Sequence, residues 1–113
     1  MATPTHDDLW AVALFAARLE NPATRQDAAW SWNQALYDHN IIDPDYSPDN
    51  ARSWLRSVVA DSTFVASIDL EQVRAMMTFL SRAERFCDGR IEKYANNGVI
   101  ALLCRRVGEL AAD

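Results

Sequence analysis

The 113-residue sequence has few of the residues that usually mark a site or a cellular address. It contains only two cysteines, so it indicates no disulfide framework, and the default compartment is the reducing cytoplasm. Three glycines and four prolines leave little room for flexible linkers. No apolar run approaches the roughly 20 residues that a membrane-spanning helix needs. The first residues also lack the basic and apolar regions of a signal peptide. We therefore expect one cytoplasmic domain without a membrane segment.

Motifs for catalysis are missing as well. The sequence has no phosphate loop, dinucleotide fingerprint or nucleophile elbow. The side chains that could bind a soft metal are Cys87, Cys104, His6 and His39, and their spacing does not match a zinc site. Cys104 lies in the most apolar run of the chain, which is typical of a core residue. We expect a protein that is not an enzyme and that has no cofactor and no metal.

One loop invites comparison with a calcium site. Residues 43–49 place aspartates at positions one, three and seven of a possible EF-hand loop. Such a loop needs glycine at position six and glutamate at position twelve, where this chain has Pro48 and Trp54. The pattern favours an Asx-Pro turn that leads into a capped helix.

Charge is distributed unevenly along the chain, which has a net charge of −5. Residues 1–69 contain ten acidic and four basic residues, a balance of −6, whereas residues 70–113 contain six acidic and seven basic residues, a balance of +1. An acidic surface repels phosphate backbones, so direct binding to nucleic acid is disfavoured. This charge suits a basic protein partner, although it also fits the simpler interpretation that acidity keeps the protein soluble.

Every long segment has helical periodicity, and there is no internal repeat. The sequence therefore predicts an all-α compact bundle of five or six helices in a single domain. Apolar residues wrap most of the first helix, which predicts that it is largely buried. Residues 64–66 are compatible with a short extended or helical piece. The predicted helices span about 4–20, 24–40, 48–59, 69–86, 89–96 and 99–110.

Sequence signals for helix starts support these boundaries. A small polar residue before proline, or three residues before an acid or amide, is typical of a helix N-cap. The predicted caps are Thr3 before Pro4, Thr24 with Asp27, Ser47 before Pro48, and Asp69 with Gln72.

The C-terminal segment from Leu70 to Leu110 carries an Arg-x-x-Arg-Phe-x-x-Gly pattern, then a short helix, a glycine and an apolar helix. Its positions here are Arg82, Arg85, Phe86, Gly89, Gly98, Leu102, Leu103, Arg105 and Arg106. This segment, about a third of the chain, resembles a family of small bacterial proteins known only as a domain of unknown function. The resemblance implies a helical fold and no mechanism, and it leaves residues 1–69 as a possible separate elaboration.

The same pattern has a physical interpretation as a helix corner. Phe86 can plug the corner at the end of its helix, and Asp88 can cap the helix that follows. Arg82 and Arg85 would then pair with acidic residues of the same segment or bind the last carbonyls of their own helix. The alternative is that these two arginines bind an anion.

The pair Trp30 and Trp32 indicates a second candidate site. Residues two apart on a helix point about 200° apart, so the two indoles face different sides. Trp32 shares an apolar face with four other residues of its helix, Ala28, Ala29, Ala35 and Leu36. Trp30 then lies on a mixed aromatic and polar face, of the kind enriched at protein interfaces, unless the bundle buries both tryptophans. The predicted partner-binding residues are Asp27, Trp30, Gln34, Tyr37, Asp38, Asp43 and Asp45.

These observations favour an interaction module that binds a basic protein through its acidic, aromatic N-terminal part. One concrete version is an inhibitor of a basic nucleic-acid-handling complex, like the anti-CRISPR and other anti-defence proteins of phages. Two alternatives remain open. One is a small-anion binder or unrecognised enzyme that uses Arg82 and Arg85, and the other is a structural subunit that dimerises. Either a monomer or a homodimer fits the sequence.

Overall fold

The computed structural model describes residues 3–85 and 88–112, which form seven α-helices, one 3-10 helix and no strand. The all-α prediction is confirmed, and the radius of gyration of 12.6 Å fits one compact globule. None of the described helices is long and apolar enough to cross a membrane. Phe86 and Cys87, and the corner plug predicted there, lie outside the described residues. The elements are α1 (His6–Ala13), α2 (Phe15–Glu20), α3 (Arg25–Asp38), α4 (Pro48–Ala60), η1 (Ser62–Ser67), α5 (Leu70–Ala83), α6 (Arg90–Asn96) and α7 (Val99–Ala112).

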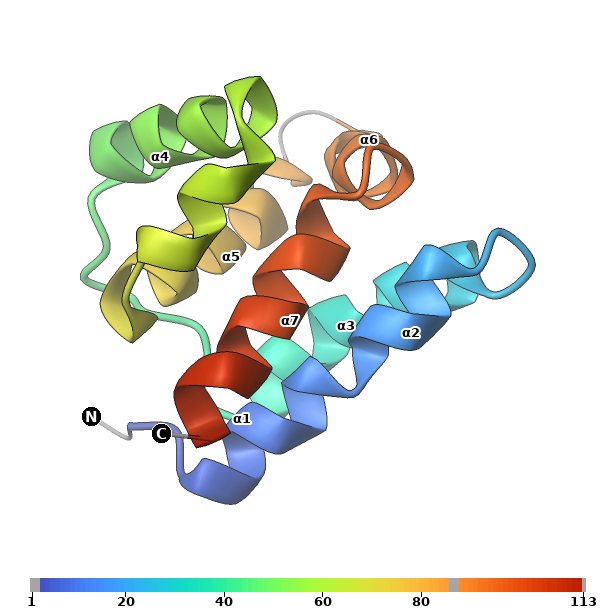
Figure 1. Cartoon of the computed structure of the whole chain (residues 1–113), viewed down its shortest axis with the longest axis horizontal. Coiled ribbons are helices and arrows are strands. Elements are labelled where there is room, and N and C mark those ends of the chain that lie inside the picture. Colours follow the sequence, from blue (N-terminus) through green and yellow to red (C-terminus); the bar gives the residue numbers. More distant parts are fainter. Residues whose placement is uncertain (1–2, 86–87, 113) are drawn as a thin grey trace.

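Helix α7 runs through the middle of the fold, with α1 and α2 on one side and α5 on the other (Figure 1). It contacts α1, α2, α5, α6 and η1. This central position follows from its sequence, which is apolar on most of its circumference. Its buried residues are Val99, Ile100, Ala101, Leu103, Cys104, Val107 and Ala111.

The predicted count of five or six helices is wrong because the first predicted helix is two helices. The chain turns at Leu14, between α1 and α2, and both pieces pack on α7. The prediction that this region is largely buried is also too strong, since Trp10 is 39% exposed and Leu14 is 72% exposed. Helices α1 and α7 approach closely at Ala13 and Gly108. A Cβ atom at Gly108 would lie 3.3 Å from the Cβ atom of Ala13.

One predicted N-cap, Thr3, is wrong, and a second, Thr24, is the N-cap residue of α3 but lacks the predicted side-chain bond. Helix α1 starts after Thr5 rather than Thr3, because Thr5 and Asp8 form a reciprocal capping box. The backbone N–H of Thr5 donates to Asp8 Oδ2 at 2.8 Å, and that of Asp8 donates to Thr5 Oγ1 at 3.2 Å. At the start of α3, Thr24 forms no side-chain cap, because its hydroxyl donates to the carbonyl oxygen of Arg18 at 2.7 Å.

The other two predicted caps are confirmed. Ser47 accepts a hydrogen bond from the backbone N–H of Asn50 at the start of α4, which has Pro48 in its first turn. Asp69 and Gln72 form a full capping box at the start of α5. These local bonds satisfy backbone donors that the first turn of a helix leaves unpaired.

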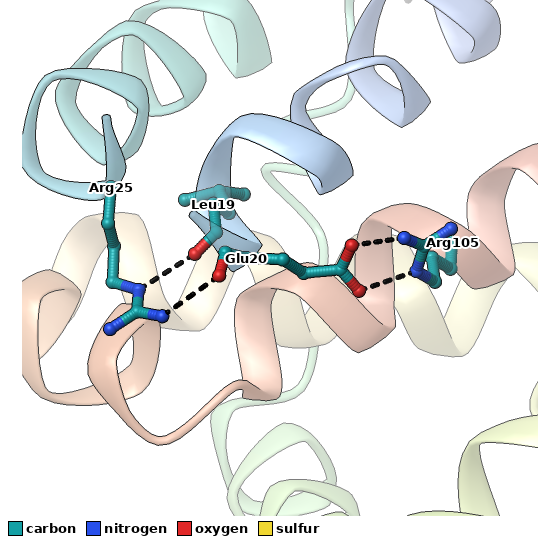
Figure 2. Close-up of polar contacts among 4 residues, drawn as sticks. All are labelled: Leu19, Glu20, Arg25 and Arg105. Carbon is teal, nitrogen blue, oxygen red and sulfur yellow. Dashed lines mark hydrogen bonds and ion pairs between the residues drawn. The ribbon is translucent and has the colours of Figure 1, made fainter. Parts of the chain in front are cut away.

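Arginine side chains join the helix ends to their neighbours. Arg25 of α3 donates to the carbonyl oxygens of Leu19 (2.8 Å) and Glu20 (3.3 Å), which end α2 (Figure 2). The carboxylate of Glu20 accepts two hydrogen bonds from Arg105 of α7, one of them 2.7 Å from Nε to Oε2 (Figure 2). This ion pair lowers the pKa of Glu20 below its ordinary value. One carboxylate and two guanidinium groups thus connect α2, α3 and α7.

A third arginine fixes the chain after α3. The helix ends near Asn40, whose positive φ of 59° is the left-handed conformation that asparagine tolerates best after glycine. The next carbonyls have no helical partner, and Arg74 of α5 binds them. Its Nε donates to the oxygen of Ile41 at 3.1 Å, and its Nη2 lies 3.3 and 3.4 Å from those of Asn40 and Ile42. Arg74 therefore anchors the loop that leads to α4.

The two tryptophans of α3 point to opposite sides, as the helical period predicts. Trp32 is 0% exposed and Trp30 is 50% exposed. The apolar face predicted with Trp32 is buried throughout. Cys104 of α7 is fully buried, and this burial raises the pKa of its thiol well above the ordinary range, so the expectation that Cys104 is a core residue is confirmed.

We predict that Trp32→Ala destabilises the protein by about 3–5 kcal/mol, because it leaves a large cavity in a close-packed core. The matched change Trp30→Ala removes a half-exposed ring and is expected to cost about 1 kcal/mol or less. Denaturant unfolding followed by far-UV circular dichroism measures both values. Equal losses in the two variants would contradict the burial described here.

We also predict a specific pH dependence for Asp8. The backbone hydrogen bond from Thr5 and the side-chain contact with His39 (2.9 Å) lower the pKa of this carboxyl below 3.8. A lowered pKa contributes stability above the unfolded-state value that is lost as pH falls through the folded-state value. Asp8→Asn should lower the melting temperature at neutral pH, and the difference from wild type should shrink below about pH 4.

Thermal melts across this pH range test the point, with the exposed neighbour Asp7→Asn as the control. A deficit in Asp8→Asn that is equally large at neutral and acid pH would show that the ionised carboxylate does not contribute.

Candidate anion-binding groove

Three helices each contribute two residues, one turn apart, to a groove of about 320 Å³. Residues four apart lie on one face of a helix, so both members of each pair point the same way. The groove is floored by Leu55 and Leu80. Figure 1 shows α4 and α6 near the same end of the molecule. The pairs are Arg52 and Arg56 of α4, Phe79 and Ala83 of α5, and Arg90 and Tyr94 of α6.

The start of α6 is held by a side chain of the preceding turn. Gly89 adopts a left-handed conformation with φ of 94°, which glycine reaches without a Cβ clash. The carboxylate of Glu84 accepts hydrogen bonds from the backbone N–H groups of Gly89 (2.8 Å) and Ile91 (2.9 Å). The prediction that Asp88 caps this helix is therefore wrong, and Glu84 does so instead. These hydrogen bonds fix the start of α6 and therefore the backbone position of Arg90.

A second lobe of about 260 Å³ continues the groove toward the loop before α4. Arg52 and Arg90 line both lobes, whereas Arg56 lines only the first and Arg82 only the second. We call the first the inner lobe and the second the outer lobe, and the two together the arginine groove. Tyr46 also lines the outer lobe.

The charge of the arginine groove is one-sided. Four of the ten arginines of the chain line it, and the described lining residues include no aspartate or glutamate. Guanidinium groups stay protonated at any physiological pH. The nearest acidic contact recorded for Arg52 is Asp49 at 3.9 Å, and both side chains are largely exposed, so this pair neutralises little.

Aromatic rings support two of these arginines. The guanidinium of Arg52 lies 5.7 Å from the centroid of Phe79, and that of Arg82 lies 5.4 Å from the centroid of Tyr46. Cation–π contacts hold a guanidinium in place without neutralising its charge. Neighbouring rings thus hold these two guanidinium groups in place.

The side chains that line the groove are suited to binding an anion. Its polar side chains are guanidinium and phenol groups, and its described lining contains no histidine, cysteine or carboxylate. Arginine presents a planar fork of N–H donors that matches the oxygens of phosphate or carboxylate. The arrangement can therefore hold an anion.

The structure places five of the predicted partner-binding residues on the outer face of α3. Asp27, Trp30, Gln34, Tyr37 and Asp38 are all exposed. The amide of Gln34 donates to Asp38 at 3.1 Å. Trp30 borders a small hollow of about 160 Å³ between α3 and α6. These five residues are called the α3 face below.

The other two predicted residues, Asp43 and Asp45, lie in the loop between α3 and α4. The carboxylate of Asp43 accepts a hydrogen bond from the backbone N–H of Asp45 at 3.0 Å, so it is used within the loop. This is the Asx turn expected from the sequence. Within residues 3–85 and 88–112 there is no group of three or more histidine, cysteine or acidic side chains that could hold a metal ion.

Arg82 and Arg85, which the sequence suggested as one possible anion site, make separate contacts in the structure. Arg82 lines the outer lobe, whereas Nη2 of Arg85 donates to the hydroxyl of Tyr37 on α3 at 3.3 Å. The same hydroxyl lies 3.4 Å from Ser81 Oγ, which donates to Asn33 at 2.6 Å. Arg85 and Tyr37 therefore help to join α5 to α3, and the ring of Tyr37 remains 41% exposed.

Sequence reasoning missed Arg52, Arg56 and Arg90. The four-residue spacing of Arg52 and Arg56 was available as a signal that both lie on one helical stripe. No feature of the sequence shows that this stripe faces Arg90, which is 34 positions further along the chain than Arg56. Only the packing of α4 and α6 on α5 brings these charges together.

Fold and groove together define an all-helical domain with an arginine-lined groove. The chain matches the family of unknown function DUF6508 over residues 6–113 and belongs to it. The match starts at residue 6, so it includes the N-terminal helices as well as the segment from Leu70 whose pattern suggested a family. No curated protein and no solved structure matches the chain.

Proposed function

We propose that this protein is a non-catalytic domain that binds a small, multiply charged anion in the arginine groove. The observation that carries this proposal is the meeting of four arginines from three helices in one groove whose described lining has no acid. An anion site at Arg82 and Arg85 was one alternative from the sequence. The site proposed from the structure includes Arg82 but not Arg85, and it adds Arg52, Arg56 and Arg90.

The energetics favour this function over a purely structural role. Like charges held close together repel, and the repulsion is stronger beside low-dielectric protein than in water. The other arginines at helix ends have partners that offset such a cost. Arg25 and Arg74 bind backbone carbonyls, and Arg105 binds a carboxylate. In the groove, a bound anion would supply negative charge beside Arg56 and Arg82, for which no acidic partner lies among the described residues.

A binding role also accounts for the composition of the groove. General acid–base catalysis uses a group whose pKa lies near the working pH, most often histidine or a carboxyl group. The described lining residues offer none of these side chains. This composition supports our proposal that the protein is not an enzyme.

We predict that inorganic pyrophosphate raises the melting temperature of the wild-type protein at low ionic strength, and that added salt weakens the effect. Arg56→Gln removes one charge-assisted contact, worth about 1.5–3 kcal/mol, and should weaken binding by roughly 10- to 100-fold. Titration calorimetry measures the affinity directly.

The matched control is Arg18→Gln, which removes the same charge from α2, where Arg18 stacks on Phe15. Its binding should equal that of the wild type. If Arg56→Gln and Arg18→Gln bind pyrophosphate equally well, the arginine groove is not the site. Arg85→Gln tests the sequence-based alternative, and we expect it to retain binding because Arg85 contacts Tyr37.

A second candidate function is protein binding through the α3 face. The specific observation is that Trp30, 50% exposed, lies beside a hollow and on the same helix face as Asp27 and Asp38. Aromatic side chains with a polar rim are enriched at interfaces, and the two carboxylates suit a basic partner. Inhibition of a basic nucleic-acid-handling complex, as by anti-CRISPR proteins, is the most concrete version of this proposal and rests on the net charge of −5.

We predict that affinity capture from the native host recovers a partner with the wild type and loses it with Trp30→Ala. Trp10→Ala is the matched control, because Trp10 is also exposed, at 39%, but lies on α1. Electrostatic association should weaken as salt rises. A partner that survives Trp30→Ala and is lost with Trp10→Ala would exclude the α3 face.

A further inference from the structure

We propose that the protein forms a symmetric homodimer through an apolar groove between α1, the start of α2 and the C-terminal half of α7. This groove has a volume of about 450 Å³ and is called the α1–α7 groove below. None of its described lining residues belongs to the arginine groove, so a dimer formed here is independent of the proposed anion binding.

Small residues leave the α1–α7 groove unfilled. Its lining includes three alanines and one glycine, which are Ala13, Ala16, Gly108 and Ala112. Their side chains end close to the backbone, so α1, α2 and α7 pack together and still leave a hollow between them. Trp10 and Leu14, one turn apart on α1 and at its end, are the large apolar side chains of the lining.

Both of these large side chains are exposed to solvent. Leu14 is 72% exposed, the highest value among the large apolar side chains of residues 3–85 and 88–112. Trp10 is 39% exposed, and its Nε1 lies 3.3 Å from Nε2 of His6, so the polar edge of the ring already has a neighbour in its own helix. Apolar surface gathered around a hollow is typical of an interaction site, because a partner removes it from water.

The charges at this groove cancel. Arg105 and Glu109 are its charged lining residues. Arg105 binds Glu20, and Glu109 lies 3.4 Å from Arg106, so the four side chains carry no net charge. The net charge of −5 therefore belongs entirely to the rest of the chain. A second copy of this acidic protein meets no net charge when it approaches through the α1–α7 groove.

The groove also complements itself, which a two-fold interface requires. It combines a hollow with the exposed Leu14, so Leu14 of each copy can enter the hollow of the other. Arg105 and Glu109 lie one turn apart on α7. When two α7 helices approach in antiparallel orientation, Arg105 of one copy comes opposite Glu109 of the other, and the symmetry repeats this contact. These features favour a second copy of the chain as the occupant.

Such a dimer leaves the arginine groove accessible. Helix α1 lies near the end of α7 that carries the C-terminus, whereas α4 and α6 lie toward the other end (Figure 1). The two faces can therefore be occupied at the same time.

Sedimentation of the whole chain over a wide range of protein concentration tests the proposal. We expect a reversible monomer–dimer equilibrium for the wild type, and a dissociation constant raised about 100-fold or more in Leu14→Asp. The reason is that this change places an unpaired carboxylate in each of the two apolar contacts. Leu14 is the N-cap residue of α2, a position that favours aspartate, so the variant is expected to fold. Thermal melts check this.

The matched control is Val59→Asp, which makes the same kind of change at an exposed apolar residue of α4 (55% exposed). It adds the same charge to the protein and should leave the dissociation constant unchanged. Equal effects of Leu14→Asp and Val59→Asp would overturn the proposed interface.

A charge reversal tests the antiparallel arrangement. Glu109→Lys changes the net charge from −5 to −3, which by itself reduces repulsion between copies. We nevertheless expect it to weaken the dimer by about tenfold, because it places like charges opposite each other twice. Glu71→Lys, at an exposed acid of α5, is the control and should not weaken the dimer. A dimer that Glu109→Lys leaves unchanged or strengthens would contradict the arrangement.

A wild type that stays monomeric at every concentration would overturn the proposal altogether. In that case, the apolar dye anilinonaphthalene sulfonate distinguishes what remains. If it binds the wild type and not Leu14→Asp, the groove belongs to an apolar partner other than a second copy. If it binds neither, the groove is not an interaction site.

Discussion

The burial of α7 is the interaction on which the rest of the structure depends. This helix is apolar around most of its surface, and removal of that surface from water is the main favourable term in folding. Helices α1, α2, α5 and α6 and the 3-10 helix η1 all pack against it. Each of them keeps one apolar stripe for this contact, so its opposite, polar stripe is forced outward. Helices α3 and α4, which carry the α3 face and two of the groove arginines, pack on elements that themselves contact α7.

Arginine has two different uses in this fold. Arg25, Arg74 and Arg105 bind carbonyl or carboxylate oxygens and fasten helix ends to their neighbours. These bonds replace partners that the end of a helix lacks. In the arginine groove, by contrast, the rings of Phe79 and Tyr46 hold two guanidinium groups without neutralising them. The contrast between arginines bound to oxygen atoms and arginines held against aromatic rings distinguishes the groove from the scaffold in a protein that is acidic overall.

Much of the secondary structure was predictable because it depends on neighbours a few residues apart. Ser47 and Asp69 cap the helices as predicted, and the 3.6-residue period correctly placed Trp30 and Trp32 on different sides of their helix. The predicted caps and helix ends were wrong where two neighbouring residues could both cap a helix, or where a side chain bonded a more distant group. Helix α1 is capped by Thr5, which forms a capping box with Asp8, and not by Thr3. The hydroxyl of Thr24 was taken by a carbonyl six residues away, and packing on α7 accompanied a turn at Leu14.

The sequence by itself determined the all-helical class, the core position of Cys104 and the opposite directions of Trp30 and Trp32, because helical period and capping act over one or two turns. Only the tertiary structure decided where the charges meet. Counted along the chain, the arginines of α4 fall in an acidic half and Arg82 and Arg90 in a slightly basic one. Packing of α4 and α6 on α5 places all four in one groove and sends Arg85 to another helix. Electrostatic interactions depend on distance in space, and sequence separation does not specify that distance.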